Sequence, residues 1–549
     1  MEISYIVFEF FSEKSNSMYG QFMTEWTDRR VGDLIPTRAA RFPDRELFRF
    51  DERRVSYVEF DSWVTAVAAD MHRHGVTRGD RILVQLPNCL EALVLQVAAF
   101  RIGAIDVPVI PIYRTHETRQ IIADTRPAVI AAASGLGSRR PQHEIDGILH
   151  DLGHQPAVRY SVGQPSSGWH QLPDADPNGT AGPDLPEPAD PDDAALILYT
   201  SGTTSAPKGA VLDSRSLLAQ IRNMVSSAAL DETTVLAVGT PLSHLSGFVA
   251  GLLLPAYLGA RAVILPSWRP EEAVELIDAE RVTTMMGATV FLQDLVSQYA
   301  GGAAPGHRLG HYMCAGSAIP PGLIDDAERV GIFATRHYGM TETAGICTGS
   351  DRSDPAQRRR EWDGRVLPGM QIQAVDDDRR PLADGCAGEL RIRGPQLFSG
   401  YTDPGLNAAQ FDADGWFYPG DVGVLDDGWL RMTGRSKDIV NRGGEKFSTQ
   451  DIEQALLTHP DIVAAAVTAV PDSRLGEAVG AWIVLADGVQ WPGPSSYLRH
   501  LDSAHLAKAK FPVEWHVVQQ IPTTASGKVQ KYALHQIPDL ATATQARLS

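Results

Sequence analysis

The spacing of hydrophobic positions changes along the chain, and each spacing predicts a different kind of element. Residues 57–74 and 89–103 carry apolar positions at helical spacing, whereas residues 81–86 form a short apolar run typical of a buried strand. This alternation runs from residue 31 to about residue 136 and returns between residues 216 and 333. Repeated alternation of helix and strand predicts α/β layers around a largely parallel sheet.

The pattern changes after Gly364, where helical spacing becomes scarce. Residues 366–430 contain many short β-prone pieces separated by Asp-Gly and Pro-Gly turns, which predicts a distorted antiparallel β region. Farther on, helical patterns at residues 449–458 and 497–508 flank a strand pattern at residues 462–470. These last elements predict a separate α+β lobe.

The fold class expected from these patterns is α/β with two domains. Residues 23–436 should form a large N-terminal domain of layered α/β subdomains plus a distorted β-barrel. Residues 437–549 should form a small, mobile α+β C-terminal domain. Residues 1–22 are an atypical N-terminal extension, whose apolar stretch is too short and too acidic for a signal peptide, and they receive no function.

The composition is that of an ordinary globular protein, with 43% hydrophobic and 21% charged residues over 549 positions. The formal net charge of −18 disfavours nucleic acid and anionic membranes as partners, so a bound polyanion must be met by a few local cations and a metal. No apolar run reaches the roughly 18 residues that span a bilayer. Four scattered cysteines without a CxxC pair predict free, buried thiols in a reducing cytoplasm.

A run of hydroxyl groups and glycines follows the strand predicted over residues 194–199 and extends from Thr200 to Gly209. Glycines allow a backbone to approach an anion closely, while the hydroxyls, the free N–H groups and the Lys208 ammonium supply donors and charge. The order differs from a Walker A loop, because Lys208 precedes Gly209 and a second β-prone stretch follows. The run is therefore predicted to grip nucleotide phosphates, with a Ser/Thr/Gly-rich surface turn as the alternative.

Four further motifs follow in order: YGMTE at residues 338–342, YPGD at 418–421, GRSKD at 434–438 and TASGK at 524–528. Together with the hydroxyl-rich loop, this set resembles the adenylate-forming superfamily of acyl-CoA synthetases, peptide-synthetase adenylation domains and luciferases. Each motif alone is weakly specific, whereas the ordered set is very specific and covers nearly the whole chain. The resemblance implies an enzyme that converts a carboxylic acid and ATP into an acyl-adenylate and pyrophosphate, and then passes the acyl group to a thiol.

The resemblance also implies a role for each motif residue. Glu342 would anchor Mg²⁺, Thr341 would donate a hydrogen bond to the α-phosphate, and Tyr338 would stack on adenine unless it is a core residue. Asp421 would accept hydrogen bonds from both ribose hydroxyls, although an Asp after Pro-Gly is otherwise a turn residue. Lys528 would be delivered by the small lobe to stabilise charge between the carboxylate and the α-phosphate.

The set implied for ATP and AMP is larger and draws on the loop, the segment before the YGMTE motif and the domain junction. It comprises Thr200, Ser201, Gly202, Thr203, Thr204, Lys208, Gly316, Ser317, Ala318, His337, Tyr338, Gly339, Met340, Asp421 and Arg435. Lys437 falls where the family has its hinge, with a solvated surface charge as the alternative. ATP, Mg²⁺ and the co-substrate CoA are implied by the same resemblance.

The segment PLSHLSG at residues 241–247 resembles the acid-site motif of the family. His244 is therefore expected beside the substrate carboxylate as a catalytic residue, although a lone His near an apolar stretch is more often structural. Leu245 stands where siderophore aryl-acid ligases usually have Asn. A leucine cannot pair with a ring hydroxyl, which disfavours salicylate-type acids and leaves alicyclic or medium-chain acids closer. The implied acyl pocket comprises His244, Leu245, Phe248, Gly316 and Gly339, the two glycines leaving space for a bulky acid.

Several functions agree with these motifs, and an acyl-CoA ligase is favoured. A stand-alone adenylation enzyme that loads a carrier protein in trans is one alternative. A relative that adenylates an oxyanion such as nitrite for transfer to an amine is another, and a degenerate nucleotide-binding protein is the non-enzyme alternative. A homodimer is compatible with each of them. Ser205, which replaces a usual Gly, and Thr523, which replaces a usual Arg or Lys, affect kinetics and partner choice but remove no essential group.

Overall fold

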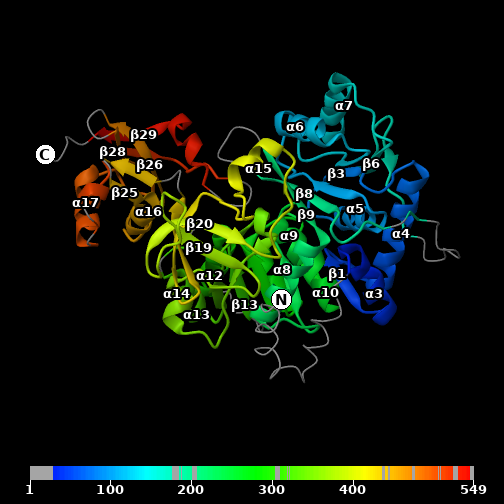
Figure 1. Ribbon diagram of the computed structural model, residues 1–549, viewed down its shortest axis with the longest axis horizontal. Coiled ribbons are helices and arrows are strands. Elements are labelled where there is room, and N and C mark those ends of the chain that lie inside the picture. Colours follow the sequence, from blue (N-terminus) through cyan, green and yellow to red (C-terminus); the bar gives the residue numbers. More distant parts are fainter. Residues whose placement is uncertain are drawn as a thin grey trace.

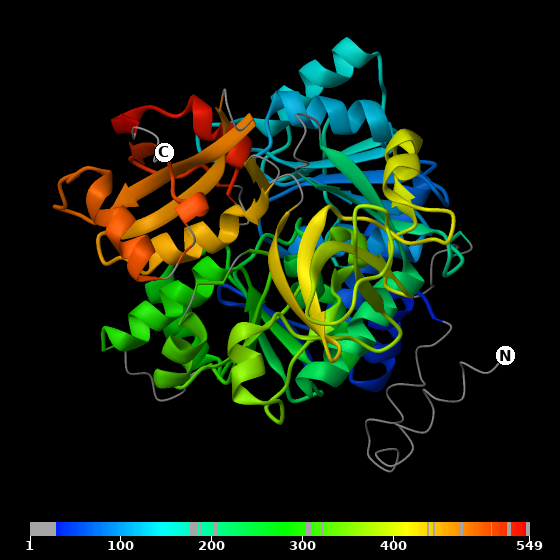
Figure 2. The ribbon, with the colours of Figure 1, turned by 60° about the vertical axis from the view of Figure 1, so that its left-hand side comes forward.

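The computed structural model shows a large body and a small C-terminal lobe, drawn in orange and red to one side of the body in both views (Figures 1 and 2). This arrangement confirms the predicted α/β fold with a large N-terminal and a smaller C-terminal domain. The structure describes residues 29–175, 185–186, 188–200, 207–302, 309–317, 319–320, 322–435, 439–442, 445–472, 476–504, 506, 508–523 and 529–544.

An eight-stranded sheet forms one layer of the body, in the order β21–β9–β8–β4–β3–β5–β6–β7. The pairs from β8 through β7 are parallel, whereas β8–β9 and β9–β21 are antiparallel. The strands predicted at residues 194–199 and 81–86 are confirmed as β8 and β3. The bounds are β3 Arg81–Gln85, β4 Ile105–Pro108, β5 Val129–Ala133, β6 Val158–Val162, β7 His170–Gln171, β8 Ala194–Thr200, β9 Lys208–Asp213 and β21 Gly400–Tyr401.

A seven-stranded sheet forms a second layer, in the order β14–β13–β12–β10–β11–β1–β2. Its strands run parallel except for the β1–β2 hairpin. The alternation predicted between residues 216 and 333 is confirmed by this sheet. Its bounds are β1 Glu46–Phe50, β2 Arg53–Ser56, β10 Val235–Val238, β11 Arg261–Ile264, β12 Thr284–Gly287, β13 His311–Cys314 and β14 Phe333–Arg336.

The two helices predicted in the body, at residues 57–74 and 89–103, are confirmed as α4 and α5. The helix expected at residues 57–74 begins at Tyr57, because the Ser56 side chain accepts a hydrogen bond from the backbone N–H of Glu59 in a capping box. The bounds are α3 Leu34–Arg41, α4 Tyr57–Arg73, α5 Leu90–Arg101, α6 Thr115–Thr125, α7 Pro141–Leu152, α8 Ser214–Ala228, α9 Leu245–Phe248, α10 Leu254–Leu258, α11 Pro270–Ala279, α12 Thr289–Ala300, α13 Leu323–Arg329, α14 Ala356–Glu361 and α15 Pro404–Gln410.

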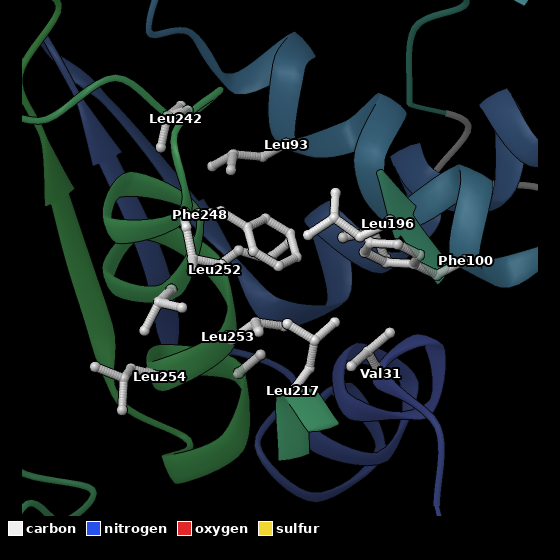
Figure 3. Close-up of a cluster of buried hydrophobic side chains, with 14 of the residues drawn as sticks. Val31, Leu93, Phe100, Leu196, Leu217, Leu242, Phe248, Leu252, Leu253 and Leu254 are labelled. Carbon is white, nitrogen blue, oxygen red and sulfur yellow. The ribbon is translucent and has the colours of Figure 1, made fainter. Parts of the chain in front are cut away.

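One hydrophobic cluster joins the two sheets through the helices between them. Figure 3 shows part of this cluster, in which Leu93 of α5, Leu196 of β8 and Phe248 of α9 converge. The rings of Phe248 and Phe100 meet edge to face with centroids 6.0 Å apart. Burial of large apolar side chains on this scale holds the two sheets in a fixed relation. The helices between the sheets therefore share one hydrophobic core with both of them.

The antiparallel region predicted at residues 366–430 is confirmed as a six-stranded sheet in the order β17–β18–β23–β22–β20–β19. A short two-stranded ribbon of β15 and β16 precedes it in the chain. The bounds are β15 Gly339–Met340, β16 Gly345–Ile346, β17 Thr348–Gly349, β18 Arg365–Val366, β19 Gln371–Val375, β20 Ala387–Arg393, β22 Asp421–Asp426 and β23 Trp429–Arg435.

The C-terminal lobe has a sheet in the order β25–β24–β27–β28–β29, with β26 also paired to β27. The lobe has two hydrophobic clusters, one of which contains Trp515 and the other Trp482. The bounds are β24 Ile439–Arg442, β25 Glu445–Ser448, α16 Thr449–Leu457, β26 Ile462–Asp472, β27 Gly476–Leu485, α17 Pro494–Ser503, β28 Glu514–Val518 and β29 Asp539–Thr544.

Two expectations need correction. The helix predicted at residues 497–508 is α17, which begins earlier, at Pro494, and ends at Ser503. Proline fits the first turn of a helix because its fixed φ is pre-set and its missing N–H has no partner there. The cysteines are free as predicted, but only three are buried, since Cys386 is exposed. Within the described ranges, no helix is long and apolar enough to cross a membrane.

Candidate functional site

The hydroxyl-rich loop connects β8 to β9. The pair Thr200–Lys208 is the last pair of the hairpin before this loop. Residues 201–206 lie outside the described residues, and with them the predicted ligands Ser201, Gly202, Thr203 and Thr204. Gly209 has a packing reason as well as the predicted electrostatic one. A Cβ there would lie 2.9 Å from Thr402 Oγ1 and 3.0 Å from the Tyr199 ring, closer than ordinary contact.

A third strand, β21, lies against the hairpin and carries a residue that the motifs did not reveal. Tyr401 pairs with Ala210 of β9, and its ring centroid is 5.7 Å from the Lys208 Nζ. Its hydroxyl donates a hydrogen bond of 2.7 Å to Oε1 of Glu342. Burial, followed by the charge of Glu342, raises the pKa of Tyr401, so the phenol remains a neutral donor. The structure thus brings Lys208 and Glu342 to the two sides of one buried tyrosine.

Glu342 lies half-buried in a 3₁₀ turn, Thr341–Thr343, directly after β15. Met340 and Thr341 are half-buried beside it. Gly339 was expected to leave space for an acid, but the structure gives another reason for glycine at this position. A Cβ on Gly339 would lie 2.1 Å from the Gly345 carbonyl oxygen of the paired strand β16. The glycine is therefore required by the close approach of two backbones.

Tyr338 and Asp421, which come from separate motifs, are in direct contact. The Tyr338 hydroxyl donates a hydrogen bond of 2.7 Å to Asp421 Oδ2, and Arg435 Nε lies 2.9 Å from Asp421 Oδ1. Asp421 is the first residue of strand β22 and pairs with Arg435, the last residue of strand β23. It is therefore not the turn residue that the Pro-Gly context allows. Tyr338 is nearly buried, and burial together with the Asp421 charge raises its pKa well above the usual value.

His337 was expected among the nucleotide-binding residues, but its ring is fully engaged inside the protein. Its Nδ1 lies 3.0 Å from the Thr348 carbonyl oxygen, to which it donates, and its Nε2 lies 2.8 Å from Thr335 Oγ1. The same Thr335 hydroxyl lies 2.9 Å from His311 Nε2. The structure therefore assigns the imidazole of His337 to a buried chain of hydrogen bonds behind Tyr338.

Acidification is expected to destabilise the protein through this histidine pair. Burial lowers the pKa of His311 to about 3 and that of His337 to about 4. The unfolded chain takes up these protons near the ordinary pKa of about 6.5, so the stability that depends on neutral rings is complete above that pH. It is lost as the pH falls from about 6.5 towards 4, by up to about 1.4 kcal/mol per pH unit for each histidine.

Urea unfolding at several pH values between 7.5 and 5 measures this loss. His311→Gln should reduce the pH dependence, because one of the two buried rings is removed. His150→Gln is the matched control, since the His150 side chain is 90% exposed. An unchanged slope in His311→Gln would contradict the assignment of the pH dependence to this buried chain.

A buried ion pair between Arg336 and Asp363 stabilises the segment that carries His337 and Tyr338. Arg336 donates to Asp363 Oδ1 through Nε and Nη2, at 3.1 and 2.8 Å. Asp363 Oδ2 accepts from the Met432 N–H at 2.8 Å, which ties β14 to β23. The Thr348 hydroxyl donates to the Asp363 carbonyl oxygen and accepts from the Tyr338 N–H at 2.7 Å. The position of Tyr338 therefore depends on a polar network that no motif contains.

The acid-site motif forms the start of helix α9. His244 is its N-cap residue, and its Nδ1 accepts from the Ser246 N–H and lies 3.0 Å from Ser246 Oγ. Gly247 is required here, because a Cβ would lie 2.0 Å from the Pro241 carbonyl oxygen. Phe248 is fully buried and packs in the hydrophobic cluster of Figure 3, so the structure gives it a packing role. Leu245 is also nearly buried.

The remaining predicted residues are only partly placed. Gly316 has a φ of +88°, a conformation that favours glycine, and Ser317 Oγ donates to Thr289 Oγ1 at 2.9 Å. Ala318, Lys437 and Lys528 lie outside the described residues. The segment that carries Lys528 is closed by a bridge between Thr523 and Val529.

The chain after that bridge is anchored on the lobe. Lys531 Nζ lies 2.7 Å from Glu453 Oε1 and 2.7 Å from Thr449 Oγ1, both on helix α16. Glu453 Oε1 also accepts from the Val467 N–H at 2.7 Å. These contacts fix the chain just beyond Lys528 to the start of α16.

Comparison with known proteins agrees with this architecture. A family model described as AMP-binding enzyme matches residues 35–402, and one described as AMP-binding enzyme C-terminal domain matches residues 451–528. A medium-chain fatty-acid–CoA ligase of Escherichia coli is 32% identical over 534 residues, covering 96% of this chain and 93% of the relative. A salicyl-AMP ligase/salicyl-S-ArCP synthetase of Mycobacterium tuberculosis is 32% identical, covering 94% of this chain and 92% of the relative.

Solved structures resemble the chain over the same length. The ATP-bound crystal structure of MatB from Rhodopseudomonas palustris has a TM-score of 0.81 and 26% identity, and it covers 92% of this chain and 99% of its own. The resemblance to adenylate-forming enzymes that the ordered motifs predicted is thus confirmed, and the chain belongs to the AMP-binding enzyme family.

Proposed function

We propose that this enzyme activates a carboxylic acid with ATP to an acyl-adenylate, releasing pyrophosphate, and then transfers the acyl group to the thiol of CoA. The observation that carries the proposal is the convergence of residues from separate motifs. Lys208 and Glu342 both contact Tyr401, and Tyr338 and Arg435 both contact Asp421. The medium-chain fatty-acid–CoA ligase among the relatives supports the same reaction.

The electrostatic problem of the reaction matches the charges of the site. A carboxylate must approach the α-phosphorus of a polyanion, so positioning and charge neutralisation dominate the barrier. Lys208 and the loop that it closes would hold the β- and γ-phosphates, and Thr341 would donate to the α-phosphate. Asp421 would receive the ribose hydroxyls beside the Tyr338 ring, on which adenine would stack. His244 would sit beside the acid carboxylate.

Mg²⁺ fits Glu342 as a site with one protein carboxylate. Across the part of the chain that the structure describes, no three His, Cys, Asp or Glu side chains are grouped to hold a metal. Mg²⁺ commonly uses one or two carboxylates and completes its shell with waters and phosphates, so Glu342 with the nucleotide suffices. When bound, the ion neutralises phosphate charge. Glu342 would hold the ion, and Lys208 would add a second positive charge from the hairpin.

The C-terminal lobe would deliver Lys528 for adenylation, with Lys437 as the hinge between arrangements. The Ser-Gly pair that precedes Lys528 in the sequence predicts a flexible tip, which would suit a residue delivered by lobe closure. The bridge between Thr523 and Val529 and the anchored Lys531 support this role, because they hold both ends of the tip on the lobe.

The acid is proposed to be a medium-chain or alicyclic carboxylic acid. Leu245 is nearly buried and offers no hydrogen bond to a ring hydroxyl, which would cost about 1–3 kcal/mol if left unpaired. Loading of a carrier protein is the second candidate function, favoured by the full-length similarity to a salicyl-AMP ligase/salicyl-S-ArCP synthetase.

An acid panel in a pyrophosphate-release assay tests the proposal, followed by mass spectrometry with CoA or a carrier protein as acceptor. Release that depends on medium-chain acids and gives acyl-CoA supports it. Release without CoA consumption, combined with acylation of the carrier, would favour the second function. Absence of ATP-dependent release with every acid would overturn both.

A further inference from the structure

Tyr401 is held between two parts of the site that are far apart in sequence. Its side chain is nearly buried, and the ring of Phe398 packs edge to face against it with centroids 4.8 Å apart. The Tyr401 hydroxyl reaches Glu342, 59 residues earlier in the chain, while its ring faces the Lys208 ammonium. One rigid side chain therefore touches both the carboxylate and the cation proposed for magnesium and phosphate.

The backbone around Tyr401 is tied to the same two parts. The Phe398 N–H donates to the Glu342 carbonyl oxygen at 2.9 Å, and the Thr402 N–H donates to the Gly209 carbonyl oxygen at 2.8 Å. Before Tyr401 the chain is fixed to the 3₁₀ turn that contains Glu342. After Tyr401 it is fixed to Gly209, at the start of strand β9. The phenol has little freedom to leave this position.

We propose that Tyr401 is a positioning residue that holds the Glu342 carboxylate in a metal-binding orientation and fixes its position relative to the Lys208 ammonium. The inference rests on the proposed function, since it concerns the Mg²⁺ and phosphates of that site. The hydroxyl occupies Oε1 of Glu342 and fixes the carboxylate plane, so that the other oxygen faces a constant direction. Partners that orient a metal-binding carboxylate typically change metal affinity about 10- to 100-fold when they are removed.

The ring makes a separate contribution through Lys208. An ammonium about 6 Å or less from an aromatic centroid is attracted by the ring face, and the 5.7 Å separation lies within that range. This contact guides the lysine side chain at the closing pair of the hairpin before the nucleotide arrives. Removal of the hydroxyl alone should therefore affect the metal, whereas removal of the ring should also affect the phosphates.

Calorimetric binding of a non-cleavable ATP analogue to the full chain, titrated with Mg²⁺, tests the proposal. Tyr401→Phe keeps the ring and removes the hydroxyl, so the half-saturating Mg²⁺ concentration should rise about tenfold or more. The affinity for AMP should change less than about twofold, because AMP lacks the phosphates that share the metal. Tyr401→Leu should in addition weaken binding of the analogue without Mg²⁺.

Two comparisons separate positioning from a general structural effect. Tyr160→Phe is the matched control, because the buried Tyr160 of β6 also donates its hydroxyl to a carboxylate, that of Asp70 on α4, at 2.6 Å. This variant should leave the Mg²⁺ dependence unchanged. In a Glu342→Gln background, Tyr401→Phe should lose its effect on Mg²⁺, because the hydroxyl acts through the carboxylate.

The outcomes distinguish this inference from the proposed function. If wild-type protein binds the analogue with Mg²⁺ and Tyr401→Phe shows the same half-saturating Mg²⁺ concentration, the positioning role is overturned. An equal effect of Tyr401→Phe with and without Glu342 would overturn it as well. If wild-type protein does not bind the analogue at all, the proposed function itself fails.

Discussion

Lys528→Ala is expected to slow acyl-adenylate formation by about 10²- to 10³-fold, the usual effect of removing a preorganised group that stabilises developing charge. Transfer from a pre-made acyl-adenylate to the thiol should remain largely intact, because the carboxylate and the α-phosphate have already been joined in that half-reaction. Pyrophosphate release measures the first half-reaction, and thioester formation from synthetic acyl-adenylate measures the second.

The exposed Lys508 of the same lobe supplies the control, since Lys508→Ala removes an equal charge from the lobe at a position outside the TASGK motif. That variant should retain both half-reactions. Equal losses of both half-reactions in Lys528→Ala would show that the lysine does not serve adenylation specifically.

Asp363→Ala is expected to lower the free energy of unfolding by about 3–5 kcal/mol, the usual effect of leaving one member of a buried ion pair without its partner. The side chains of Arg336 and Asp363 are only 10% and 9% exposed, so solvent cannot replace the lost carboxylate. The substitution also removes the acceptor of the Met432 N–H. Denaturant unfolding with an unchanged m-value measures the effect.

Asp151→Ala is the matched control, because it removes the same side chain from the exposed pair of Arg119 and Asp151, separated by 2.9 Å. Exposed pairs contribute about 0–1 kcal/mol, so this variant should stay close to wild type. A similar small loss in Asp363→Ala would show that the buried pair does not hold β14 to β23.

The elements with a strong repeat could be predicted from the sequence alone. Strand β8 and helix α4 are predicted within one residue of their observed ends at both sides, since apolar spacing is a local signal. Helix α17 was placed too late, because its start is determined by Pro494 and its end lies at Ser503. Local propensity fixes an element, but its ends depend on caps and on neighbouring packing.

The site shows a similar division. Tyr338 and Asp421 were found because each lies in a recognisable motif, and the structure brings them together. Tyr401 was missed, because its hydrogen bond joins positions 59 residues apart and no spacing rule relates them. His337 stands next to a motif residue, between strands β14 and β15, but its ring nitrogens are engaged by Thr348 and Thr335, which are 11 residues later and 2 residues earlier in the chain, and no motif contains these partners.

The clusters of buried apolar residues in the described ranges divide at the junction of body and lobe. Those of the body end with Leu430, and those of the lobe begin with Val440. If the lobe rotates on the body, as proposed, none of these clusters among the described residues would have to be divided. Such a rotation would then cost little buried apolar area, which would suit a lobe that changes its orientation between the two proposed half-reactions.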